Sequence, residues 1–165
     1  MCDDLAFRPA TPDDLSALWS IRNRAARIQC VGHYPPAALD TWLAAAPSDG
    51  FRHLLRQGHA IVAERDRSIV GYTVVDVGER ELEALFVAPN HFRRGHGSKL
   101  LARAEELARQ EGIDILTLSA ALNAIDFYLA HGYELLALDD YAHRSGVRLK
   151  RGVMQKSLKL LGRSS

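Results

Sequence analysis

The stretch that decides the fold runs from Phe86 to Ala108 and reads FVAPNHFRRGHGSKLLARAEELA. A strand-like apolar end meets a proline, and two arginines, a Gly-His-Gly and a helix-forming segment follow. A helix N-terminus carries free N–H donors and about half a positive charge, and glycine lets the backbone approach an anion closely. Arg93 and Arg94 add charge-assisted hydrogen bonds. We therefore predict that this loop binds an anion such as a pyrophosphate.

Other glycine-rich loops explain the stretch less well. A P-loop requires GxxxxGK[ST], which the sequence lacks. A dinucleotide fingerprint requires a third glycine after Gly95 and Gly97, and Leu100 stands in that place. The partner motifs of a kinase-type loop are missing as well. The remaining alternative is that the loop binds no anion and only turns the chain. The strand before it and the helix after it argue against this alternative.

Hydrophobic patterning predicts the elements on either side of the loop. A short strand precedes a helix that Thr11 caps, with Pro12 at its first position, and that ends near Ile28. A second helix lies within residues 34–47. The remaining elements are strands at 59–65, 68–78 and 81–87, a helix at 97–110, a strand at 114–120, a helix at 121–132 and strands at 133–140 and 151–158. The order β-α-α-β-β-β-α-β-α-β-β predicts a single α/β domain over residues 1–165, with helices on the faces of one mixed sheet.

Composition narrows the class of protein. The 165 residues carry a net charge of +1, which gives no global field toward nucleic acid or membrane. The stretch from Arg144 onward is basic, and we expect it to be a solvated end. Cys2 and Cys30 form no disulfide framework. The sequence shows neither a signal-peptide pattern nor a long apolar run, so we expect a cytoplasmic protein. We also expect a monomer or a homodimer.

The loop resembles the acyl-CoA-binding motif of the GNAT superfamily of N-acetyltransferases, which reads roughly V-x-P-x-x-[Q/R]-x-x-G-x-G/A-x-x-L-L. The matching positions are Val87, Pro89, Gly95, Gly97, Leu100 and Leu101. Phe92 occupies the Gln/Arg position, which is a departure. A second stretch, AIDFYLAHGYELL from Ala124, resembles the family pattern A-x-x-x-Y-x-x-x-G-F through Tyr128 and Gly132. The order of elements also agrees, so the resemblance covers most of the chain.

The resemblance implies that acetyl-CoA is the co-substrate. It assigns cofactor binding to Leu85, Phe86, Val87, Arg93, Arg94, Gly95, His96, Gly97, Ser98, Lys99 and Asn123. The family's usual asparagine would fall at Ala121, two positions before Asn123. The histidines of the loop, His91 and His96, lie outside any HExxH or Cys/His cluster, so we expect no metal site.

The implied reaction is the direct attack of an amine on the thioester, which needs a neutral amine and therefore a base. Family bases lie on the strand before the glycine-rich loop. Period-2 alternation places Glu81 and Glu83 on one face of that strand, and Glu83 is closer to the expected thioester. The alternative is that these are edge-strand charges in water.

Tyr128 matches the family's general acid, which protonates the leaving thiolate. A phenol is a suitable proton donor for an alkyl thiolate. The alternative is a core tyrosine that packs its helix on the sheet. A backbone N–H near Phe86 or Val87 would hold the oxyanion.

The acceptor is expected between residues 28–45 and the late strands, at His33, Tyr34 and Trp42. These three residues also carry a weaker likeness to a little-studied bacterial subgroup of the family. Few carboxylates lie nearby, so a polycation is not indicated, and the expected acceptor is a primary amine of a small molecule or peptide. Two alternatives remain. The departures at Phe92 and Ala121 suit a non-catalytic acyl-CoA sensor or regulatory module, whereas the basic end would suit a nucleic-acid partner, which we consider weakly supported.

Overall fold

The computed structural model describes residues 5–159, so Cys2 and the last arginine, Arg163, lie outside the described part. Its elements are β1 Ala6–Pro9, α1 Leu15–Gln29, α2 Pro36–Ala44, α3 Asp49–Arg56, β2 Ala60–Arg65, β3 Ser68–Asp76, β4 Glu81–Val87, α4 His96–Gln110, β5 Ile115–Ala121, α5 Ile125–Ala130, β6 Glu134–Ala142 and β7 Arg148–Ser157. Short 3-10 turns precede α1, α4 and α5. Within residues 5–159, no helix is long and apolar enough to cross a membrane.

The predicted α/β class with a mixed sheet is confirmed, and one helix was missed. The missed helix, α3, has only eight residues, which gives a weak periodic signal. It begins where the Ser48 hydroxyl accepts a hydrogen bond from the Phe51 N–H at 3.1 Å. Its buried residues Phe51, Leu54 and Leu55 follow helical spacing. The element order therefore has three helices, not two, between β1 and β2.

The predicted helix start at Thr11 is confirmed. Thr11 is the N-cap of the 3-10 turn that leads into α1, and Pro12 is its first residue. The Thr11 N–H donates to the Asp14 carboxylate at 2.8 Å, so one of the free N–H groups of the helix start is satisfied. Arg8 forms an ion pair with the same carboxylate at 2.9 Å, which ties β1 to this start.

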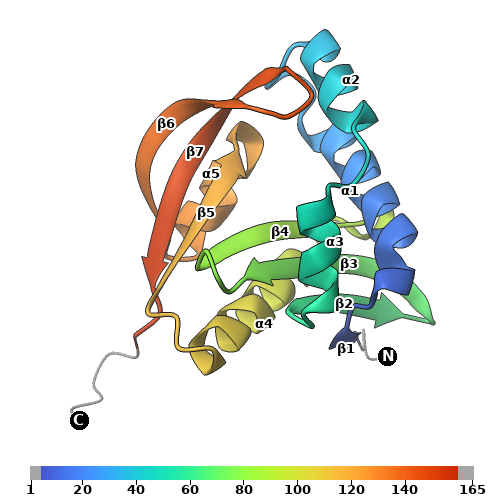
Figure 1. Cartoon of the computed structure of the whole chain (residues 1–165), viewed down its shortest axis with the longest axis vertical. Helices are drawn as coiled ribbons and strands as arrows, with labels where there is room; N and C mark the ends of the chain where they lie inside the picture. Colours follow the sequence, from blue (N-terminus) through green and yellow to red (C-terminus); the bar gives the residue numbers. More distant parts are fainter. Residues whose placement is uncertain (1–4, 160–165) are drawn as a thin grey trace.

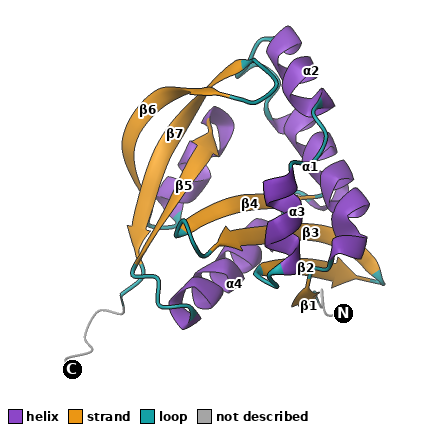
Figure 2. Ribbon diagram, in the orientation of Figure 1, coloured by secondary structure: helices purple, strands orange, loops and turns teal. Residues whose placement is uncertain are grey.

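Seven strands form one sheet in the order β1-β2-β3-β4-β5-β7-β6, and all neighbours are antiparallel except β4 and β5 (Figure 1). The parallel strands β4 and β5 pair only through Glu81↔Thr117 and Leu82↔Leu118. Beyond Leu82 they diverge, because β5 pairs along its whole length with β7 (Figure 2). The sheet therefore opens into a wedge between β4 and β5.

Helices cover both faces of the β1–β4 half of the sheet. On one face, α1 and α3 pack Leu18 and Phe51 against Tyr72 of β3. On the opposite face, α4 packs its buried Leu100 against β3. The approach of α4 is close, because a Cβ atom at Gly71 would lie only 2.8 Å from Leu100 Cδ1. The two layers fix the start of α4 beside the wedge.

Candidate active site

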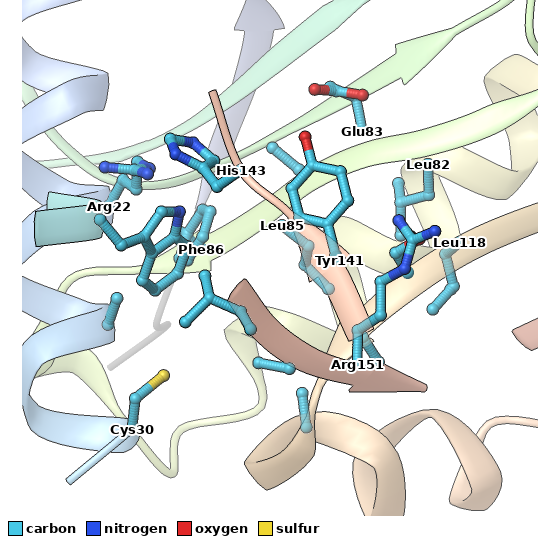
Figure 3. Close-up of a pocket in the computed structure, with 18 of the residues that line it drawn as sticks. Arg22, Cys30, Leu82, Glu83, Leu85, Phe86, Leu118, Tyr141, His143 and Arg151 are labelled. Carbon is cyan, nitrogen blue, oxygen red and sulfur yellow. The ribbon is translucent and has the colours of Figure 1, made fainter. Parts of the chain in front are cut away.

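The wedge opens into a cavity of about 590 Å³ whose walls come from β3, β4, β5, α1, α2, α3, α5 and the β6–β7 hairpin (Figure 3). The predicted residues on its wall are Tyr34, Trp42, Glu81, Glu83, Leu85, Phe86, Asn123 and Tyr128. The cavity thus joins the strand before the glycine-rich loop with the second motif. Residues that are far apart in the sequence share one site.

Glu83 occupies a β-bulge. In the register of β3 with β4, Val74 pairs with Ala84 and Val75 pairs with Leu82, so Glu83 has no partner on β3. The Thr73 hydroxyl donates to the Ala84 carbonyl at 2.9 Å beside the bulge. A bulge bends its strand and re-aims a side chain, and such features are frequent next to active sites. Here the bulge follows directly after the last pair between β4 and β5.

The environment of Glu83 raises the pKa of its carboxyl group to about 7, chiefly through burial and then through the charges of Glu81 and Asp76. More than a third of the residue is still accessible, because it faces the open cavity while protein surrounds it on the other sides. Burial also raises the pKa of Glu81, and the charge of Arg151 opposes that rise. A carboxylate that titrates near neutral pH is well suited to accept a proton from an amine.

Tyr128 is a buried part of the cavity wall, where its ring packs against Phe127 and Tyr133 with centroid distances of 5.1 and 5.5 Å. Burial raises the pKa of its phenol, so the hydroxyl keeps its proton at neutral pH. The neighbouring Tyr133 hydroxyl is fixed, because it donates to Glu105 at 2.8 Å. Tyr128 therefore has the packing contacts of a core residue and a hydroxyl that is chemically a proton donor.

The glycine-rich loop turns through the left-handed conformation at Arg93 and Gly95, with φ of 64° and 79°. Helix α4 then begins at His96, and the Lys99 N–H donates to the Gly95 carbonyl at 3.2 Å. No backbone or side-chain acceptor within residues 5–159 is found for the N–H groups of Arg93, Arg94, Gly95, Gly97 and Ser98. Successive free N–H groups at a helix start form a concave anion site, which fits a pyrophosphate.

Helices α4 and α5 meet at this loop. A Cβ atom at Gly97 would lie 3.5 Å from the Phe127 ring, and the Ser98 hydroxyl lies 2.8 Å from His131 Nε2. The opposite ring nitrogen of His131 lies 2.7 Å from the Phe127 carbonyl, which accepts its proton. His131 Nε2 is then the acceptor for Ser98. The loop that offers the N–H groups is thereby held against the helix that carries Tyr128.

The three predicted acceptor residues have different positions. Trp42 lies on the cavity wall, whereas His33 is exposed and lines a separate recess beside Tyr34. The Tyr34 hydroxyl donates to the Lys150 carbonyl at 2.6 Å and accepts from the Leu122 N–H at 3.0 Å. It fastens the loop after α1 to the ends of β5 and β7. The structure therefore gives Tyr34 a bracing contact and leaves His33 outside the cavity.

Asn123 lies on the cavity wall, where its side-chain oxygen accepts a hydrogen bond from the Cys30 thiol at 3.2 Å. Burial raises the pKa of this thiol to about 11, so it is not a nucleophile at neutral pH. No group of three or more potential metal ligands occurs among residues 5–159.

Sequence reasoning missed Arg22, Tyr72 and His143, which also line the cavity. Arg22 is only 6% exposed, and the buried stripe of α1 consists of Leu18, Ile21, Arg22, Ala25 and Ala26. An arginine at an apolar position of a helical repeat was the available signal. Tyr72 and His143 gave no such signal, because the tertiary fold alone brings them to the cavity.

Comparisons with known proteins agree with this geometry. Residues 56–135 match the family model described as the acetyltransferase (GNAT) domain. The matched segment runs from the end of α3 into β6 and contains the wedge strands, the glycine-rich loop and Tyr128. This segment, just under half of the chain, therefore carries a GNAT acetyltransferase domain. A search of curated proteins found no match.

Solved structures share the fold. A GCN5-related N-acetyltransferase from Rhodopseudomonas palustris, also described as aminotransferase class II, is 25% identical with a TM-score of 0.84, covering 95% of this chain and 98% of that one. The paia N-acetyltransferase from Thermoplasma acidophilum, in complex with coenzyme A, is 17% identical with a TM-score of 0.74, covering 93% and 99%. The protein yncA from Salmonella typhimurium, with its cofactor acetyl-CoA, is 23% identical with a TM-score of 0.64, covering 99% of both chains.

Proposed function

We propose that this chain transfers the acetyl group of acetyl-CoA to a primary amine of a small molecule or a peptide by direct attack. The observation that carries the proposal is the cavity in the β4–β5 wedge, which joins a carboxyl group titrating at about pH 7 to a protonated tyrosine. The free N–H groups at the start of α4 fit the pyrophosphate of the co-substrate. The coenzyme A in the similar structure from T. acidophilum and the acetyl-CoA in that from S. typhimurium support the same choice.

In the proposed reaction, Glu83 accepts the proton of the acceptor's ammonium group, directly or through a water molecule. The neutral amine attacks the thioester carbonyl carbon, and a backbone N–H of β4 near Phe86 or Val87 holds the developing oxyanion. The Val87 N–H is the better candidate: the Ala88 N–H donates to Val70 of β3, and because bonded pairs alternate along an antiparallel ladder, the Val87 N–H faces away from β3, where β4 no longer pairs with β5. The C–N bond forms, the C–S bond breaks, and Tyr128 gives its proton to the departing thiolate. The acylated nitrogen then releases its extra proton, which restores the Tyr128 phenol through a water molecule. The products are an N-acetylated amine and coenzyme A.

The alternative is an acyl-CoA-binding module without catalysis, which the departure at Phe92 supports. Thiol release from acetyl-CoA, measured with a panel of amino acids, polyamines, peptides and antibiotics, separates the two functions. Release with at least one amine supports the transferase. An increase of melting temperature with acetyl-CoA, together with no release on any amine, would support the binding module instead.

A further inference from the structure

Arg22 is a buried cation without a counter-ion. Among residues 5–159, no carboxylate lies within ion-pair distance of its guanidinium group, which donates one hydrogen bond to the Asn23 side chain at 2.7 Å. The group lies 4.2 Å from the Trp19 ring centroid and 4.8 Å from that of Trp42. Buried charges are normally paired, and these two rings hold the guanidinium in place without neutralising it. Arg22 is therefore preorganised for an anion that enters the cavity.

Further hydrogen-bond donors surround the same corner of the cavity. Arg144, which also lacks a carboxylate partner in the described part of the chain, donates to the Ala46 carbonyl. His143 lies beside Arg22 in Figure 3, and its Nδ1 accepts the Ser145 N–H at 3.1 Å. The proton of the neutral ring is then on Nε2, which becomes a donor. Burial, and then the charges of Arg144 and Arg22, lower the pKa of His143, so its ring is neutral beside the two arginines.

The cavity has the opposite charge on its other wall, where β4 carries Glu81 and Glu83. The Tyr72 hydroxyl is buried, has no hydrogen-bond partner in the described structure, and feels the charges of both Arg22 and Glu83. Arg151 does not join the positive corner, because it is paired with Asp139 at 2.8 Å. A ligand that matches both walls carries an amine at one end and an anion at the other.

We propose, on the basis of the proposed acetyl transfer, that the acceptor is an amino acid whose carboxylate binds Arg22 while its amine faces Glu83. A guanidinium group presents a planar pair of donors that matches a carboxylate. The hydroxyl of Tyr72 and the Nε2–H of His143 supply neutral donors beside it. A polyamine would instead bring a second positive charge toward Arg22 and Arg144, so it is excluded by like-charge repulsion.

The test compares thiol release with each amino acid and with its own carboxamide, which keeps the amine and side chain and removes the negative charge. For the best amino acid, we expect kcat/KM to be at least about tenfold higher than for its carboxamide, which is the effect of losing a hydrogen bond to a charged group. The substitution Arg22→Met should bring this ratio close to one, mainly by raising KM for the amino acid. Arg24→Gln is the matched control, because Arg24 is exposed on the same helix outside the cavity, and its ratio should not change.

Several outcomes would overturn the assignment. Equal kcat/KM for amino acids and carboxamides would refute the carboxylate site and leave the proposed acetyl transfer intact. If Arg22→Met lowers kcat/KM equally for the amino acid and its carboxamide and also lowers the melting temperature, Arg22 is a structural residue. Should Arg22→Met fail to fold, Arg22→Gln replaces it, and an unchanged preference for amino acids over their carboxamides in that variant would also refute the proposal.

The test distinguishes failure of this inference from failure of the proposed function. If no amine releases thiol, the transferase proposal fails, and calorimetry with the panel amino acids then tests the anion site alone. Binding that Arg22→Met abolishes and Arg24→Gln preserves would support the site. The absence of any binding would overturn it.

Discussion

Substitution of Glu83 by glutamine tests the proposed base most directly, because it keeps the shape of the side chain and removes its charge. A carboxyl group with a pKa of about 7 is ionised in about a tenth of the molecules at pH 6 and about nine tenths at pH 8. Only the ionised form accepts a proton. Removal of a general base typically lowers turnover by about 10²- to 10⁴-fold. We expect a loss of this size at pH 8 and a smaller loss at pH 6.

The assay is thiol release at saturating acetyl-CoA, followed from pH 5.5 to 8.5 for the wild type and for Glu83→Gln. The acceptor amine also becomes more reactive as it loses its proton, but this effect is common to both proteins. The ratio of wild-type to variant kcat/KM removes it and reports Glu83 alone. We expect this ratio to rise about tenfold between pH 6 and 8 and then to level off, as the ionised fraction does.

Two further variants make the result specific. Glu106→Gln, at an exposed position of α4, should leave the profile unchanged. Glu81→Gln removes a negative charge that raises the pKa of Glu83, so the inflection should move to lower pH while the plateau activity stays high. A ratio that stays constant between pH 5.5 and 8.5, as for an ordinary glutamate that is already ionised over this range, would refute the role of Glu83 as the base.

Stability provides an independent check on the same pKa. The folded-state pKa of Glu83 is raised above its unfolded value, so between about pH 4.5 and 7 the folded protein holds a proton that the unfolded chain has lost. Folding stability from this group therefore falls as pH rises through that window. Glutamine has no such dependence, so the melting temperature of Glu83→Gln should exceed that of the wild type at pH 8 by more than at pH 5. An equal difference at both pH values would contradict the raised pKa.

The remaining predictions concern the acid, the anion site and the packing of α4. Tyr128→Phe should lower kcat by about 10- to 1000-fold, with acetyl-CoA affinity and melting temperature nearly unchanged, because the ring and its packing remain; full turnover would make Tyr128 a packing residue. Gly97→Asp should abolish the increase of melting temperature caused by acetyl-CoA, since it places a negative charge at the start of α4, and an unchanged increase would remove the loop from the site. Gly71→Ala should lower the free energy of unfolding by about 1–3 kcal/mol in urea titrations, because its Cβ would lie 2.8 Å from Leu100 Cδ1 and 2.9 Å from the Phe86 carbonyl oxygen; a neutral effect would show that α4 can move.

Local chemistry allowed much of the fold to be predicted. The cap at Thr11 and the glycine-rich loop before α4 depend on neighbouring residues, and both stand where the sequence indicated. Strand alternation placed Glu81 and Glu83 together, and both reach the cavity. It did not reveal the bulge at Glu83, because a bulge depends on how β3 pairs with β4.

The acceptor side of the cavity depended on tertiary structure. His33 was chosen for its place in the sequence, but the turn after α1 leaves it outside the cavity. Arg22 was overlooked because a charged residue is expected on the solvent face of a helix. Only the packing of α1 and α2 over the wedge shows that it is buried between two tryptophans.

The bulge at Glu83 connects the architecture of the sheet to its chemistry. It follows the last pair between β4 and β5, so the residue that leaves the β3 register lies where the wedge begins. If β4 stayed paired with β5 beyond Leu82, its backbone N–H groups that face away from β3, such as that of Val87, would be engaged in the ladder. Divergence leaves those groups for a substrate and lines the same opening with the carboxyl group that has the raised pKa. One local irregularity thus lies beside both the space proposed for the thioester and the proposed base, and the proposed carboxylate site at Arg22 lies on the opposite wall.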